Sequence, residues 1–214
     1  MKVGTDGVLL GAWCPVDFHI SSFLHFHILD VGTGSGLIAR MLMQRCPEVE
    51  VEGIDIDAAA VEQARENGVR AFQARLQDWQ GSYDLIVSNP PFFQNSLKNP
   101  DKGREMARHT DTLSYEDLVK HSVRLLREGG RLALILPADA ETEIREIASR
   151  YSLYCTRITR VYSKESKPAR RVLLSFSRDT GIPGYRDTED SLVLEDEKGG
   201  RSAAYSELCR DFYL

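Results

Sequence analysis

The sequence has few of the features that mark membrane or secreted proteins. No apolar run approaches the roughly 20 residues that a transmembrane helix requires, and residues 1–13 are too short and too interrupted by glycine for a signal peptide. The four cysteines are widely spaced and form no Cys-x-x-Cys pair: Cys14, Cys46, Cys155 and Cys209. Such spacing argues against a zinc site and against a disulfide scaffold. The sequence therefore predicts a cytoplasmic protein with neither a membrane nor a metal partner.

Positive charge is also scarce overall. The chain has 27 Lys and Arg against 32 Asp and Glu, a formal net charge of −5, which argues against a protein whose whole surface binds nucleic acid. Between residues 157 and 178, however, seven basic residues stand against the single acid Glu165: Arg157, Arg160, Lys164, Lys167, Arg170, Arg171 and Arg178. This basic stripe suits phosphate binding, and it equally suits a sheet edge that stays charged against aggregation.

Short β-rich runs alternate with helical stretches along the 214 residues. Strands are expected at 27–32, 49–57, 69–76, 83–89, 131–138, 153–162 and 172–177, and helices at 37–45, 58–68, 114–130 and 142–150. Strands separated by helices predict a mostly parallel sheet with helices on both faces. The last two strands are joined by only about nine residues, too few for a helical crossover, so one strand should be antiparallel. We therefore expect one α/β domain, residues 1–214, with a seven-stranded sheet, followed by an acidic turn-rich segment and a short helix.

The segment Asp30-Val31-Gly32-Thr33-Gly34-Ser35-Gly36 joins the first predicted strand to the first predicted helix. Its glycines Gly32, Gly34 and Gly36 allow the backbone to approach a ligand and direct helix N–H groups at it. Read from Gly34, with Asp55 placed 21 residues later, the turn also matches a dinucleotide fingerprint. Asp30, an acid before the first glycine, instead favours a cationic, amine-bearing ligand over a pyrophosphate. Asp78 offers a further acceptor for an adenine amine, or is simply a turn residue.

Asn89 and Pro90 open the stretch SNPPFF, which follows the fourth predicted strand. Prolines lack the N–H that a sheet ladder needs, so Pro90 and Pro91 end the strand and stiffen the loop. The side-chain carbonyl of Asn89 and the backbone carbonyl of Pro90 could accept both hydrogens of an exocyclic amine. Phe92 could then stack on a flipped base, a contact worth about 1–3 kcal/mol. The alternative is a proline turn that closes a core strand, with Phe92 and Phe93 packed beneath it.

Four motifs, DVGTGSG, GIDID, LQDW and SNPPF, occur in the order typical of class I S-adenosylmethionine-dependent methyltransferases. The chain resembles that family over nearly its whole length. The resemblance implies a Rossmann-like fold and S-adenosylmethionine as the cofactor. It also implies that the glycine turn with Asp30 holds the methionine and ribose, that Asp55 takes the ribose hydroxyls, and that Asp78 reads the adenine amine.

Three longer blocks narrow the resemblance further: residues 1–13, residues 89–118 and the terminal RDFYL. Together they resemble the bacterial tRNA1(Val) (adenine(37)-N6)-methyltransferase family. That resemblance implies methyl transfer to an adenine N6 of tRNA, with Asn89, Pro90, Pro91 and Phe92 as catalytic residues. It implies a substrate surface made of Phe93, Lys98, Arg104, Arg108, His109, Arg170 and Arg171, although the basic loop among these could also be merely solvated. Family members usually carry a further segment before KVGTDG, so the resemblance implies that an N-terminal extension is missing here.

Other functions fit parts of the pattern. Asn-Pro-Pro-Tyr is the commoner form in enzymes that methylate a protein glutamine, and Phe92 stands at the fourth position here. A methyltransferase acting on another nucleobase amine, such as guanine N2 in rRNA, and a nicotinamide oxidoreductase are the remaining alternatives. The sequence does not reveal the oligomeric state, although a monomer is favoured.

Overall fold

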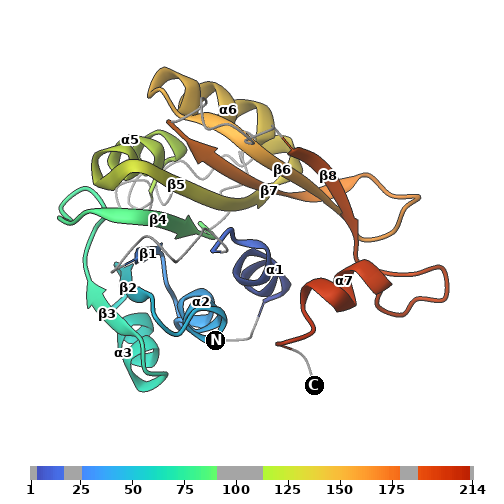
Figure 1. Cartoon of the computed structure of the whole chain (residues 1–214), viewed down its shortest axis with the longest axis horizontal. Helices are drawn as coiled ribbons and strands as arrows, with labels where there is room; N and C mark the ends of the chain where they lie inside the picture. Colours follow the sequence, from blue (N-terminus) through green and yellow to red (C-terminus); the bar gives the residue numbers. More distant parts are fainter. Residues whose placement is uncertain (1–3, 17–25, 91–112, 179–187, 213–214) are drawn as a thin grey trace, which may run out of the picture.

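The computed structural model describes residues 4–16, 26–90, 113–178 and 188–212, and its centre is an eight-stranded sheet (Figure 1). The strand order is β3-β2-β1-β4-β5-β7-β6-β8. The strands are β1 (His27–Val31), β2 (Glu50–Asp55), β3 (Arg70–Gln73), β4 (Tyr83–Ser88), β5 (Leu126–Pro137), β6 (Tyr154–Tyr162), β7 (Ala169–Ser177) and β8 (Thr188–Val193). Strand β7 runs antiparallel to both β5 and β6, and every other pair is parallel. The predicted α/β fold with one antiparallel strand is therefore confirmed, and β8 adds an eighth strand to the predicted seven.

Helices cover both faces of this sheet, as the alternation of strands and helices predicted (Figure 1). They are α1 (Thr5–Trp13), α2 (Leu37–Arg45), α3 (Ala58–Glu66), α5 (Tyr115–Leu125), the 3-10 turn η2 (Ala138–Ala140), α6 (Glu141–Arg150) and α7 (Ala203–Leu208). Helices α1, α2, α3 and α7 share one hydrophobic core with the sheet, and α5 and α6 share the other. Residues alternate between these cores along the strands: Leu85 and Val87 of β4 face α1 and α2, whereas Ile86 faces α5. No helix in the described ranges is long and apolar enough to cross a bilayer.

Helix α1 is the main element that the sequence patterns did not predict. Its residues from Gly7 to Trp13 are all buried, so it shows no polar face and lacks the periodicity of an amphipathic helix. Its last residue is anchored by a hydrogen bond from Trp13 Nε1 to Thr159 Oγ1 of 2.7 Å. The Arg157 guanidinium lies 4.4 Å from the Trp13 ring centroid. The segment at the start of the chain is therefore a core helix.

The end of α5 also differs from expectation. The predicted helix continued to Gly129 and Gly130, but α5 ends at Leu125 and β5 begins at Leu126. Gly129 has a φ of +73°, and a Cβ on Gly130 would lie 3.0 Å from the Tyr83 carbonyl oxygen. The two glycines therefore allow the irregular first part of β5 to pack closely on β4, where the register of the two strands shifts. The N-terminal boundary was correct, because the Ser114 hydroxyl accepts a hydrogen bond from the Asp117 N–H at 3.0 Å.

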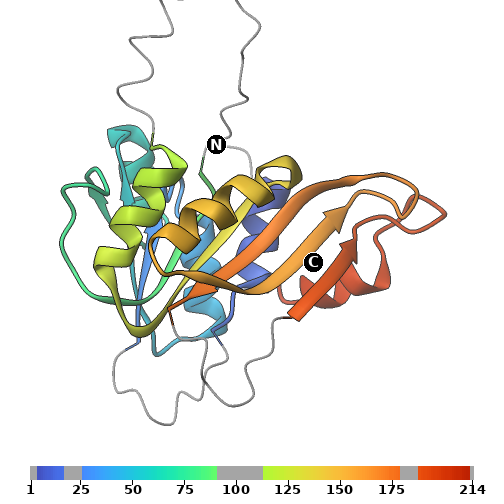
Figure 2. The same ribbon diagram turned by 90° about the horizontal axis from the view of Figure 1, so that it is seen from above.

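The hairpin of β6 and β7 extends from one side of the sheet, away from β1 and β2 (Figure 2). Its two strands pair antiparallel from Tyr154 opposite Ser177 to Tyr162 opposite Ala169. Strand β8 pairs in parallel along the outer edge of β6. Strand β8 is difficult to predict from the sequence because four of its six residues are exposed and only Leu192 is buried. The acidic segment expected to form turns thus completes the sheet.

Candidate active site at the carboxyl edge of the sheet

The carboxyl ends of β1, β2 and β4 bring three of the predicted motifs together. Val31 at the end of β1 pairs with Ile54 of β2 and with Ser88 of β4. The Ser88 hydroxyl donates a 2.8 Å hydrogen bond to the Val31 carbonyl, which fixes the end of β4 against the end of β1. The glycine turn, Asp55 and Asn89 follow directly from these positions. In open α/β sheets, ligands bind at this edge.

The glycine turn has a backbone that few other residues could adopt. Gly32, Gly34 and Gly36 have φ values of 71°, 57° and 80°, in the left-handed region. The N–H groups of Gly32 and Thr33 both donate to the Ile54 carbonyl, at 2.9 and 3.0 Å, so the turn is pinned to β2. Gly36 ends the turn as the N-cap of α2. The turn is therefore preorganised, with the N-terminus of α2 at its end.

Asp55 closes the turn from the side of β2. Its Oδ2 accepts a 2.9 Å hydrogen bond from the Gly34 N–H, and its Oδ1 accepts one of 3.0 Å from the Asp57 N–H. Next to it, Ile56 is 51% exposed, which is unusual for a large aliphatic side chain. An apolar surface thus adjoins a carboxylate at the mouth of the turn. Sequence reasoning missed Ile56, and its place directly after the acid was the available signal.

Asp30 lies inside the protein beneath the turn. The residue is fully buried, and its Oδ2 accepts hydrogen bonds from the Thr33 hydroxyl at 2.8 Å and from the Ala39 N–H at 3.3 Å. Its Oδ1 is buried without a hydrogen-bond partner among the described residues. Burial raises the pKa of Asp30 to about 6, and the two hydrogen bonds only partly offset this effect. Asp30 therefore braces the turn and also leaves one acceptor oxygen unsatisfied.

Asn89 carries a second unsatisfied acceptor. Its Oδ1 is buried, and no group in the described part of the chain donates to it. Pro90, the next residue, is buried. An unpaired buried acceptor costs about 1–3 kcal/mol, so such atoms in a folded protein call for an explanation. An N–H donor on a ligand would supply one.

Asp78 is placed differently from the other predicted site residues. It is exposed in the turn after β3, where its N–H donates to the Arg75 carbonyl at 3.1 Å. Burial and neighbouring cations lower the pKa of His121 in α5, and the charge of Asp78 partly opposes this effect. Asp78 therefore lies near α5. Within the described ranges, no hydrogen bond joins Asp78 to the glycine turn. The neighbouring Trp79 packs on Phe72, with ring centroids 5.1 Å apart.

Several predicted residues lie outside the described part of the chain. These are Pro91, Phe92, Phe93, Lys98, Arg104, Arg108 and His109. In the remainder, no group of three or more His, Cys, Asp or Glu side chains is placed to hold a metal ion.

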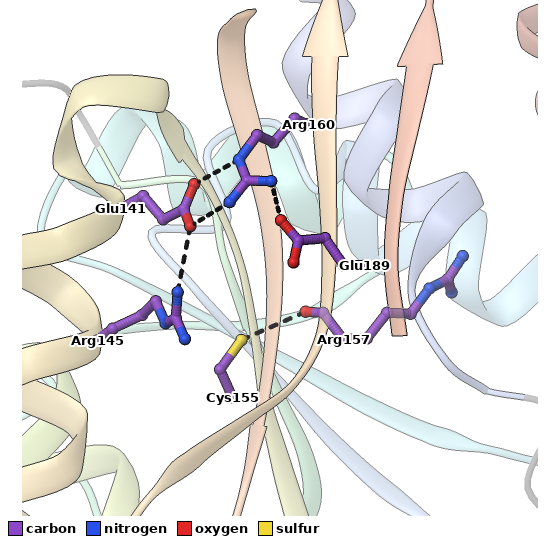
Figure 3. A network of polar contacts seen from close by, with 6 residues as sticks. All are labelled: Glu141, Arg145, Cys155, Arg157, Arg160 and Glu189. Carbon is purple, nitrogen blue, oxygen red and sulfur yellow. Dashed lines mark hydrogen bonds and ion pairs between the residues drawn. The ribbon is translucent and has the colours of Figure 1, made fainter. Parts of the chain in front are cut away.

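Four of the seven residues of the basic stripe form ion pairs, and Figure 3 shows those of Arg160. Arg160 donates to Glu141 through Nε at 2.9 Å and through a second nitrogen at 2.7 Å, and it also contacts Glu189 of β8. These carboxylates raise the pKa of Arg160, and Arg160 in turn lowers the pKa of Glu189. Arg145 joins the network through Glu141 at 3.3 Å.

Three further stripe residues also have acidic partners. Arg157 lies 3.8 Å from Asp190, Lys164 lies 3.4 Å from Glu195, and Arg171 lies 2.9 Å from Asp6. Most of these acids come from β8 and the residues after it, which sequence reasoning treated as a separate segment. Lys167, Arg170 and Arg178 are exposed. The stripe is thus much closer to neutral than its local sequence suggests.

Comparison with known proteins decides the family. Residues 18–153 match the model of the methyltransferase small domain. The chain belongs to this family. It is 41% identical to the tRNA1(Val) (adenine(37)-N6)-methyltransferase of Bacteroides fragilis, over 100% of this chain and 91% of that protein. It is 43% identical to the protein of the same name from Parabacteroides distasonis, with the same coverage.

The methyltransferase fold is also found among solved structures. A predicted O-methyltransferase from Agrobacterium tumefaciens has a TM-score of 0.69 and 16% identity, covering 96% of this chain and 95% of that one. At this identity the likeness concerns the fold alone. The predicted Rossmann-like methyltransferase fold and the methyltransferase activity are both confirmed by these findings.

Proposed function

We propose that this methyltransferase transfers a methyl group from S-adenosylmethionine to the exocyclic N6 of an adenine in tRNA, adenine 37 of valine tRNA by the names of its relatives. The observation that carries the proposal is the unsatisfied Asn89 Oδ1 at the end of β4, beside the glycine turn. An adenine amine is the kind of donor that this acceptor lacks.

The residues of the turn fit the proposed cofactor, which would supply an electrophilic methyl group. The backbone of Gly32, Gly34 and Gly36 offers a close approach, and the carboxylate of Asp55 offers acceptors for two hydroxyls. Ile56 would give the adenine ring an apolar surface, because it is exposed next to that carboxylate. Asp30 would hold the turn from below through its hydrogen bond from Thr33. Above its pKa of about 6, its carboxylate would also place a negative charge near a cationic ligand. Asp78 is assigned to the adenine amine by resemblance.

Asn89 is assigned to the substrate amine. Its Oδ1 and the Pro90 carbonyl would accept the two N–H hydrogens and draw the nitrogen lone pair out of the ring plane. Because an aromatic amine is a poor nucleophile, a fixed pair of acceptors would act mainly in the transition state. The methylated nitrogen then loses its proton to solvent or to the Asn89 carbonyl, so no general base is required. Pro91 would stiffen the loop, and Phe92 and Phe93 would stack on the flipped base.

Backbone phosphates are assigned to two groups of basic residues. By resemblance these are Lys98, Arg104, Arg108 and His109. Arg170 and Lys167 join them, because both are exposed in or beside the turn between β6 and β7. Arg171 was predicted to share this role, but its Nε donates to Asp6.

Methylation of purified tRNA tests the proposal. Wild type should produce N6-methyladenosine from labelled cofactor, as measured by mass analysis of nucleosides. Asn89→Ala should bind S-adenosylhomocysteine as wild type does and lower the rate roughly 10²–10³-fold, the usual effect of losing one preorganised acceptor or donor. Near-normal yield from Asn89→Ala would contradict the role of this amide. Transfer of methyl to a protein glutamine, with none to tRNA, would replace the proposal by its main alternative.

A further inference from the structure

Helices α1 and α2 lie side by side in parallel. A Cβ on Gly7 would lie 3.0 Å from Leu37 Cδ2, and a Cβ on Gly11 would lie 2.7 Å from Met41 Sδ. Matching steps of four residues on both helices mean that they run in the same direction. The first turn of α1 therefore lies against Leu37, the residue that directly follows Gly36 of the glycine turn.

Asp6 connects this first turn of α1 to strand β7 of the sheet. Its Oδ2 accepts a 2.9 Å hydrogen bond from Arg171 Nε, and the two side chains are 22% and 31% exposed. Arg171 also donates from Nη1 to the Arg170 carbonyl at 2.9 Å, which fixes its orientation. Arg171 lies opposite Pro137, the last residue of β5. The ion pair thus joins α1 to the carboxyl end of β5 and the start of β7.

The N-terminus of α1 has little else within its own sequence to fix it. Its N-cap is Gly4, which makes no side-chain capping hydrogen bond. Asp6 is the acid of the first turn, where a negative charge interacts favourably with the helix dipole. Besides the burial of Gly7 and Val8, the position of this turn therefore depends on the contact with Leu37 on one side and the contact with Arg171 on the other.

We propose that the ion pair between Asp6 and Arg171 positions the cofactor site, by holding the first turn of α1 against Leu37 at the end of the glycine turn. This inference rests on the proposed function, since it concerns the binding of the same cofactor. Neither residue touches the reacting atoms. Both are positioning residues, and Arg171 thereby serves the cofactor side of the reaction.

The test compares this pair with a matched ion pair elsewhere in the molecule. Arg127 and Asp84 lie 2.6 Å apart, with side chains 35% and 18% exposed, near the amino end of β4 and far along the strand from Asn89. The variants are Asp6→Asn, Arg171→Gln, the double variant, and Arg127→Gln as the control. For each, calorimetry measures the affinity for S-adenosylhomocysteine without tRNA, and thermal unfolding measures stability.

Asp6→Asn should weaken S-adenosylhomocysteine binding at least about fivefold, a typical size for coupling between sites. The double variant should be no weaker than either single variant, because both remove the same contact. Arg127→Gln should lower the unfolding temperature similarly while keeping wild-type affinity. Asp6→Asn keeps the charge of Arg171 and removes the negative charge beside it, so tRNA affinity at saturating cofactor should not fall.

Three outcomes would overturn the inference. Unchanged affinity in Asp6→Asn would show that the pair does not position the site. An equal loss in Arg127→Gln would reduce the effect to general destabilisation. Failure of wild type to bind S-adenosylhomocysteine at all would remove the proposed cofactor itself, and that result is distinguishable because it appears before any substitution is made.

Discussion

At the residue scale, burial decides how Asp30 behaves. Its pKa is raised from 3.8 to about 6, mainly because the folded protein removes the carboxylate from water. Between these pH values the folded state binds more protons than the unfolded state, so this residue makes the free energy of unfolding fall as the pH rises. The stability that a protonated Asp30 provides is complete only at low pH and is lost as the pH rises through about 6.

Replacing Asp30 by Asn should remove this titration. We expect wild type to lose up to roughly 3 kcal/mol relative to Asp30→Asn as the pH rises from about 4 to about 7, which is the free energy that corresponds to the shift. Urea unfolding of both proteins across this pH range measures the difference. A difference that stays constant with pH would contradict the raised pKa.

The site residues differ in how far the sequence could predict them. Asp30, Asp55 and Asn89 could be proposed because short motifs place them at the ends of strands that share one edge. Their environments were not predictable: Asp30 is buried in the folded protein, and its hydrogen bonds from Thr33 and Ala39 form only in the folded turn. The missing partner of Asn89 Oδ1 likewise depends on the surrounding tertiary structure.

At the scale of elements, β2 supports the glycine turn by contact as well as by hydrogen bonds. A Cβ on Gly53 would lie 2.7 Å from Thr33 Oγ1, 2.8 Å from Thr33 Cγ2 and 2.9 Å from Thr33 Cβ. The whole Thr33 side chain therefore occupies the space beside Gly53. Strand and turn can pack this closely only because β2 has a glycine at this position.

Gly53→Ala should therefore act on the turn through Thr33. Displacing Thr33 would disturb its hydrogen bond to Asp30, so we expect a loss of about 1–3 kcal/mol in unfolding free energy, as for other overpacked positions. Cofactor affinity should also decrease, because the turn that moves is the proposed binding element. Denaturant unfolding and calorimetry with S-adenosylhomocysteine measure the two effects. Wild-type values in both would show that the turn adapts without cost.

Hydrophobic periodicity predicted the helix that has one apolar face. It failed for a helix that is buried all round and for a strand that is mostly exposed. The helix at 37–45 was predicted with its observed bounds, because its apolar residues recur at helical spacing. Helix α1 is buried on all sides and contains Gly7 and Gly11, so neither periodicity nor propensity indicated it. Strand β8 has mostly exposed residues, and its place beside β6 results from long-range pairing that a local pattern cannot show.

At the scale of the whole molecule, the charge of a segment depends on what the fold places beside it. The basic stripe carries seven cations in sequence, but four of them lie within 4 Å of acids from other elements. Such pairs are partly exposed, so each contributes little to stability. Their main effect is to remove cationic potential from that part of the surface. Exposed, unneutralised cations should then dominate any salt dependence of tRNA binding.

Arg170 and Lys164 offer a direct test, because they flank the same turn with different partners. Both are exposed, but Lys164 lies 3.4 Å from Glu195, whereas Arg170 forms no ion pair with another described residue. If Arg170 contacts a phosphate, Arg170→Ala should weaken tRNA binding and reduce the slope of log affinity against log salt by about 1. Lys164→Ala should change this slope much less, since Glu195 already neutralises its charge, and neither variant should alter S-adenosylhomocysteine affinity. Equal slopes for Arg170→Ala and wild type would mean that Arg170 is only a solvated residue of the sheet edge. The phosphate contacts would then lie elsewhere on the protein.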